Sequence, residues 1–113
     1  MELKFLKEES YVGAFGHHRQ LKLYSIGNYW VKYNISDDYA NSHTINLLPI
    51  RPLRYTPEIY TEYENGYGKP TGFKIQTTSY GSLNANEFAE FLKEQHEALE
   101  VVKILTEKFV KEV

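Results

Sequence analysis

The C-terminal part of the chain, from Leu83 to Val113, has the pattern of one long amphipathic helix with a complete start signal. Asn84 is a favourable N-cap, because its side-chain oxygen can accept hydrogen bonds from the free amides of the first helical turn. Glu87 follows three residues later and completes a capping box, while Leu83 and Phe88 are spaced to pack as a hydrophobic staple. This helix constrains the architecture, because the chain before it has the patterns of strands and turns.

Residues 1–82 predict an antiparallel sheet of about four to six strands. The clearest signal is a hairpin in which residues 21–26 and 29–35 flank Gly27-Asn28, since Gly at the first central position suits a type II′ turn. That turn pairs Ile26 with Tyr29. The further candidate strands are 2–7, which also fits a short helix, 43–48, 58–64 and 71–80. We expect the last two to form a second hairpin across the turn cluster at 65–70. We therefore expect a single α+β domain over residues 1–113, with the helix of 83–113 packed on the sheet of 1–82.

Composition excludes several classes of protein. The 113-residue chain has no cysteine, which excludes disulfides, thiolate zinc sites and cysteine nucleophiles. The formal net charge of -2 argues against a dedicated duplex-DNA binder, because phosphate neutralisation supplies most of the affinity in that class. Residues 1–9 lack the apolar segment of a signal peptide, and no apolar run approaches the roughly 20 residues of a membrane span. We therefore expect a cytoplasmic protein that makes no membrane contact.

The residue types that carry chemistry do not form a recognisable catalytic or metal motif. His17 and His18 are adjacent, so on a strand they point to opposite faces and do not chelate one ion. Asp37-Asp38 lies in a Ser- and Asn-rich loop, where aspartate is typical of turns. We predict no catalytic residue, metal or cofactor. A small-molecule pocket lined by some of the ten tyrosines is a further hypothesis that the pattern leaves open.

The leading functional hypothesis comes from two residues outside the main apolar stripe of the helix. At 100° per residue, that stripe contains Phe88, Phe91, Leu92, Ala98, Leu99, Val102, Leu105, Phe109, Val110 and Val113. Val101 lies beside this stripe, and Ile104 lies nearly opposite it. A helix of about 28 residues spans about 42 Å, which is long for a domain of this size, so we expect it to overhang its sheet. These features predict a non-enzymatic protein-interaction module, dimeric or bound to another protein through Val101 and Ile104.

The explanations that compete with this hypothesis are a helix broken near residues 95–98 and isolated apolar residues at the surface.

A second function, single-stranded nucleic-acid binding, is suggested by cations interleaved with aromatic residues, because bases stack on rings while Lys and Arg follow phosphates. The residues in question are Arg51, Arg54, Tyr55, Lys69 and Lys74, and Trp30 and Lys32 extend the surface if they share its face. The order of strands and a long closing helix also resembles the architecture of the Whirly-type single-strand DNA binders. The same cations and prolines are typical of a protected sheet edge, which leaves a structural alternative open.

Overall fold

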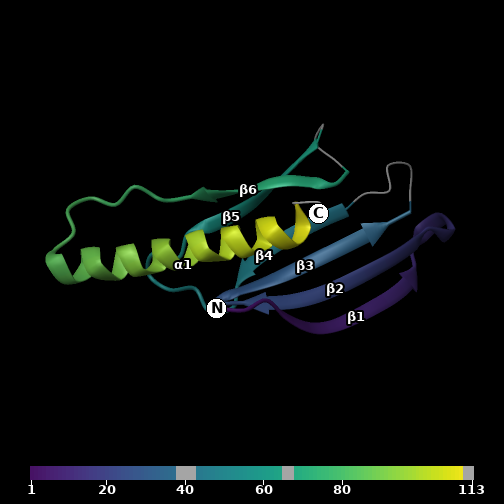
Figure 1. Ribbon diagram of the computed structural model, residues 1–113, viewed down its shortest axis with the longest axis horizontal. Helices are drawn as coiled ribbons and strands as arrows, with labels where there is room; N and C mark the ends of the chain where they lie inside the picture. The colour runs from purple at the N-terminus through teal and green to yellow at the C-terminus, as the bar shows by residue number, and fades with distance from the viewer. Residues whose placement is uncertain (38–42, 65–67, 111–113) are drawn as a thin grey trace.

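The computed structural model describes residues 1–37, 43–64 and 68–110, and it confirms the predicted α+β class (Figure 1). Its elements follow in this order: β1 (Lys4–Val12), the 3₁₀ turn η1 (Ala14–Gly16), β2 (His18–Ile26), β3 (Tyr29–Ser36), β4 (His43–Pro49), β5 (Glu58–Tyr63), β6 (Pro70–Gln76) and α1 (Ala85–Phe109). Parts of three predicted segments lie outside the described residues: the polar loop around Asp38, the middle of the turn at 65–70, and the end of the helix at Val113.

The first sheet has four antiparallel strands in the order β1-β2-β3-β4. The predicted hairpin forms its centre, with Ile26 opposite Tyr29 across the Gly27-Asn28 turn. Gly27 has a φ of 54°, whereas Asn28 is not among the residues with positive φ, and this combination is what a type II′ turn requires. The pairing of Ile26 with Tyr29 confirms the sequence-based register of the central hairpin.

Residues 4–7, which fitted either a strand or a short helix, belong to β1.

The second sheet is the hairpin of β5 and β6, which was also predicted. β6 ends at Gln76, so the predicted strand was too long, and residues 77–84 instead lead into the helix. Side chains of β5 join the two sheets: the Thr61 hydroxyl donates to the Ile45 carbonyl (2.8 Å), and the Tyr63 hydroxyl accepts from the Ile45 amide (2.7 Å). These bonds satisfy part of the free edge of β4, which is otherwise unpaired.

α1 is continuous over its 25 residues, so the alternative of a break near residues 95–98 is wrong. The capping box is present: the Glu87 amide donates to Asn84 Oδ1 (2.9 Å), and the Asn84 amide donates to Glu87 Oε1 (3.3 Å). The molecule measures 55 × 30 × 28 Å. Figure 1 shows why it is elongated: the first turns of α1 extend beyond both sheets, accompanied by the segment that follows β6. The predicted overhang is therefore found, at the N-terminal half of the helix.

The core lies between α1 and one face of the four-stranded sheet, and β5 contributes to it as well. Among the described residues, the buried hydrophobic core consists of Tyr24, Ile26, Tyr29, Val31, Ile45, Tyr55, Ile59, Ala98, Val101 and Leu105. Phe73 and Ile75 of β6 pack against this cluster from the side. Because the core is confined to the part of α1 that lies over the sheets, the overhanging turns depend on other contacts.

Candidate interaction surfaces

A row of glutamates on one side of α1 determines how the helix is rotated against the sheet. Glu97 accepts a hydrogen bond from the Asn28 amide in the β2–β3 turn (2.7 Å). Glu94 accepts from the Tyr55 amide in the segment between β4 and β5 (3.2 Å). Hydrogen bonds from amides to a carboxylate are strong because the acceptor is charged. This side of the helix is therefore held against the turn and the connecting segment.

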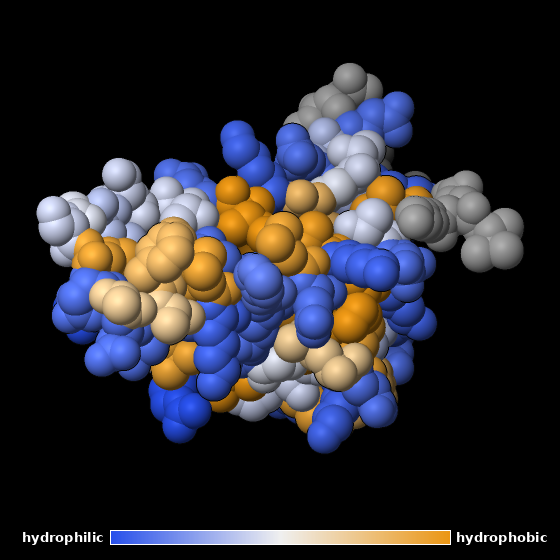
Figure 2. Space-filling view, turned by 60° about the vertical axis from the view of Figure 1, so that its left-hand side comes forward, coloured by the Kyte–Doolittle hydropathy of each residue, from blue (hydrophilic) through white to orange (hydrophobic). Residues whose placement is uncertain are grey.

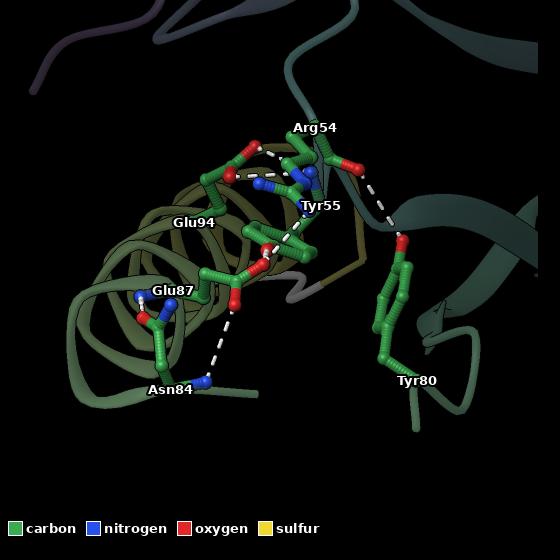
Figure 3. A network of polar contacts seen from close by, with 6 residues as sticks. All are labelled: Arg54, Tyr55, Tyr80, Asn84, Glu87 and Glu94. Carbon is green, nitrogen blue, oxygen red and sulfur yellow. Dashed lines mark hydrogen bonds and ion pairs between the residues drawn. The ribbon is translucent and has the colours of Figure 1, made fainter. Parts of the chain in front are cut away.

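Glu87 extends this row into the overhanging part of the helix (Figure 3). One of its oxygens lies 2.8 Å from Nη2 of Arg54 and accepts from the Tyr55 hydroxyl at 3.3 Å. The guanidinium of Arg54 also lies 5.2 Å from the centre of the Tyr55 ring. The Tyr80 hydroxyl donates to the Arg54 carbonyl at 3.4 Å. One carboxylate thus completes the helix cap and ties the first turns of α1 to the segment before β5.

The rotation of the helix contradicts the predicted position of Val101. Val101 is completely buried inside the core, and Ile104 is half-buried and packs against the same core. The buried stripe is turned by about 60° from the stripe expected at 100° per residue. Leu3 packs against the core, and Met1 lines a hollow together with Ile104, so the N-terminal residues cover this side. The expectation that Val101 faces outward is therefore wrong. Ile104 does not face solvent fully either, because it packs partly against the core.

The same rotation exposes a different set of apolar side chains, which we call the helix flank: Phe88, Leu92 and Leu99. Their exposed fractions are 51%, 39% and 58%. They lie within about 40° of one another around the helix axis. Figure 2, in which the overhanging end of the helix comes forward, shows apolar surface in several patches that hydrophilic side chains separate. The sequence placed all three in the buried stripe, so the structure reverses their predicted role.

The residues predicted for nucleic-acid binding do not form one surface. Tyr55 is 2% exposed, and its ring is packed edge-on against Tyr80 (4.9 Å between centres) and Phe91 (5.9 Å). It therefore offers no face for a base to stack on. Arg54 is already bound to Glu87. This part of the predicted site is a structural cluster that supports the helix.

The other three cations of that prediction lie elsewhere. Arg51 is exposed in the segment before β5, and Lys74 is exposed on β6 opposite Tyr60 of β5. Lys69 lies at the far end of β5, in the turn that leads to β6. The two arginines and Lys69 are thus separated by the length of β5, and the structure does not bring the predicted set together.

The histidines take part in local contacts. His17 lies 3.7 Å from the carboxylate of Asp37, and the amide of His18 donates to the same carboxylate. His43 Nδ1 lies 2.5 Å from the Tyr33 hydroxyl. Burial, and secondly the charge of Lys69, hold the pKa of His43 below its ordinary value. Within residues 1–37, 43–64 and 68–110, no three His, Asp or Glu side chains gather closely enough to hold a metal ion.

The surface has two larger hollows. One, of about 580 Å³, lies at the end of the four-stranded sheet and is lined by Tyr11, Arg19, His18 and His43 among others. The other, of about 700 Å³, is a groove between β4 and β5, lined by Lys32, Asn46, Leu48 and Tyr60 among others. Both hollows are open to solvent.

No model of a known protein family, no curated protein and no solved structure matches this chain. The architectural resemblance to Whirly-type proteins therefore gains no support. Among the described residues, no helix combines the length and the apolar character needed to cross a membrane.

The helix flank does not follow from the apolar stripe alone, because the stripe is broad and does not determine how the helix is rotated against the sheet. A signal was present: Glu87, Glu94 and Glu97 recur on one side of α1. Glu87 was predicted only as a cap residue, and Glu97 was placed on the solvent side of the helix. The partners of Glu94 and Glu97 are backbone amides 39 and 69 residues away in sequence. No pattern among neighbouring residues predicts a hydrogen bond to an amide so far away in the sequence.

Proposed function

We propose that this chain is a non-enzymatic protein-interaction module that pairs with a second copy of itself through the helix flank, in the cytoplasm. One observation carries the proposal: three large apolar side chains are gathered on one side of a rigid helix and are 51%, 39% and 58% exposed. Contiguous exposed apolar surface of this kind is typical of association sites, because its burial removes water from apolar area.

The arrangement of the flank favours a second copy as the partner. A two-fold axis places the same patch on both sides of an interface. In an antiparallel pair centred between Lys93 and Glu94, Phe88 of one copy faces Leu99 of the other, and Leu92 lies close to the two-fold axis. The flank lies beside the overhanging end of α1, which extends beyond the sheets in Figure 1. A second helix therefore has room to approach it.

Light scattering over a concentration series tests the proposal. We expect the wild-type protein to reach twice the monomer mass and Leu99→Glu to remain monomeric. Each Leu that leaves the interface costs about 1.5–3 kcal/mol, and a symmetric dimer loses two, so its dissociation constant should rise at least about 100-fold. Leu99 is more than half exposed in the monomer, so the variant should fold normally.

Asn86→Glu is the matched control, because Asn86 is exposed on the same helix about 120° or more from each flank residue and receives the same new charge. It should dimerise like the wild type. A wild-type protein that stays monomeric at every concentration, or a Leu99→Glu protein that still forms the dimer, contradicts the proposal.

A further inference from the structure

The face of the four-stranded sheet that points away from α1 is a second surface, which we call the outer sheet face. Side chains alternate between the two faces of a sheet, and Tyr24, Val31 and Ile45 point into the core beneath α1. Their neighbours in each strand therefore point outward. The outward residues that the register aligns are Lys4, Lys7, Glu9 and Tyr11 of β1; Arg19, Leu21, Leu23 and Ser25 of β2; Trp30, Lys32 and Asn34 of β3; and Thr44, Asn46 and Leu48 of β4.

This face is strongly cationic although the chain as a whole has a net charge of -2. It carries four cations and one carboxylate, Glu9. The carboxylate is paired with Lys7 at 3.3 Å. Lys4, Arg19 and Lys32 form no ion pair with any residue that the structure describes. The outer sheet face therefore has a positive charge that ion pairs among the described residues do not neutralise.

Flat and apolar groups lie between these cations. The register places Leu23 between Lys7 and Lys32 in one row across the sheet. The next row contains Trp30 beside Leu48, which is 47% exposed. Tyr11 is 49% exposed near Arg19 at the other end. Rows on one face of a sheet are about 6.7 Å apart, so rings and cations alternate at short intervals.

The groove between β4 and β5 continues this surface. Lys32, Asn46 and Leu48 belong both to the outer sheet face and to the lining of the groove of about 700 Å³. Tyr60, which is 46% exposed, lines its opposite wall beside Glu58. A ligand that lies across the strands therefore meets a hollow bordered by a ring, an amide and a cation, with the Glu58 carboxylate on the far wall bonded to the Tyr60 hydroxyl.

The charge of the outer sheet face selects between possible occupants. A second copy of this chain would place cations opposite cations across a two-fold axis, which is unfavourable. An anionic ligand complements the charge, and a ligand with flat rings also complements Trp30 and Tyr11. Single-stranded nucleic acid combines both properties, since its bases stack on aromatic side chains while Lys and Arg follow its phosphates.

We propose that the outer sheet face, with Trp30 at its centre and Lys4, Lys7, Arg19 and Lys32 around it, binds single-stranded nucleic acid without strong sequence preference. The proposal is independent of the helix flank, because it uses another element and another partner. It also differs from the sequence-based hypothesis, which placed the same chemistry on Arg51, Arg54, Tyr55, Lys69 and Lys74.

The single tryptophan of the chain makes the test specific, because Trp30 is the only source of tryptophan fluorescence. The wild-type protein is titrated with a 20-nucleotide oligothymidylate at about 50 mM salt and again at higher salt. We expect Trp30 fluorescence to be quenched as bases stack on the ring. We also expect the logarithm of the affinity to fall with the logarithm of salt with a slope near 2.8 for four phosphates, at about 0.7 each.

The double variant Lys7→Gln/Lys32→Gln should bind about ten-fold or more weakly at low salt, and its salt slope should fall by about 1.4. Lys32 and Lys7 are exposed, so this variant keeps the core intact. The matched control is Arg51→Gln/Lys74→Gln, which removes two exposed cations from the earlier sequence-based set. It should bind like the wild type, and so should Leu99→Glu, which separates this proposal from dimerisation.

Three results would overturn the proposal. The first is unchanged Trp30 fluorescence and unchanged anisotropy of a labelled oligonucleotide at low salt. The second is equal loss of affinity in the control double variant, which would move binding to the other cations. The third is equal quenching and affinity with poly-glutamate or with vesicles of anionic lipid, because those ligands supply charge without bases.

Discussion

At the scale of single residues, Tyr29 makes the clearest buried polar contact. It is 2% exposed, and its hydroxyl donates to the Pro57 carbonyl at 2.8 Å. Burial, followed by the charges of Glu97 and Glu94, raises the pKa of Tyr29 to about 12. The hydroxyl therefore stays protonated and keeps its hydrogen bond well above the pH at which an ordinary tyrosine ionises.

We predict that Tyr29→Phe lowers the free energy of unfolding by about 1–3 kcal/mol, because the buried Pro57 carbonyl loses its donor. Urea titration at neutral pH measures this loss. Tyr60→Phe is the control, since Tyr60 is 46% exposed, and it should change stability by less than about 0.5 kcal/mol. The raised pKa favours the protonated form in the fold, so this contribution should persist up to pH 10 and disappear as the pH rises through about 12. Equal stability of the two variants would contradict the assigned role.

At the scale of elements, α1 shows that the position of a helix in the sequence can be predicted without its rotation against the sheet. The start of the helix was predictable, because Asn84 and Glu87 bond to one another's backbone within one turn. Its rotation was not, because Glu94 and Glu97 bond to distant backbone amides. The apolar stripe is broad enough to allow more than one rotation, and these long-range bonds select one.

Two leucines of the predicted stripe provide a direct test of this rotation. Leu105 is completely buried, whereas Leu99 is 58% exposed. We predict that Leu105→Ala lowers the free energy of unfolding by about 2–5 kcal/mol, because it removes buried contacts and leaves a cavity. Leu99→Ala should change the stability of the monomer by no more than about 0.5 kcal/mol. The two variants share one chemical change on one helix, so they control for each other.

Denaturant titration should be carried out at a concentration at which light scattering shows a monomer, so that any dimer does not add to stability. If the two leucines proved equally costly to remove, the helix would have the rotation expected from its sequence pattern and not the one observed.

At the scale of the whole molecule, the two sheets meet at β4, and His43 lies at this junction. Tyr33 of β3 lies on one side of it, within 2.5 Å of Nδ1, and the charge of Lys69, next to β6, acts on it from the second sheet. Burial, followed by Lys69, lowers the pKa of His43. The neutral imidazole is therefore the form that the fold favours, with Nδ1 able to accept from the Tyr33 hydroxyl.

This lowered pKa predicts a loss of stability on acidification. The unfolded chain binds a proton at His43 at a higher pH than the folded chain does, so the contribution of His43 is complete above about pH 6.5 and is lost as the pH falls through the folded-state value. We predict that the free energy of unfolding falls less steeply between pH 7 and pH 5 in His43→Gln than in the wild type. Denaturant titrations at several pH values measure the difference, and parallel curves would contradict the prediction.

Local chemistry made much of this protein predictable from its sequence. The type II′ turn at Gly27 sets the hairpin register, and the Asn84 cap starts the helix, because each involves residues within a few positions of one another. The surfaces were decided by tertiary structure. Long-range bonds from Glu94 and Glu97, with Leu3 packed against the core, bury Val101 and expose Leu99. Strand pairing likewise gathers Lys7, Lys32 and Trp30, which are distant in sequence, on one face. A sequence pattern shows which residues are apolar or charged, but the packing of distant elements decides which of them meet solvent.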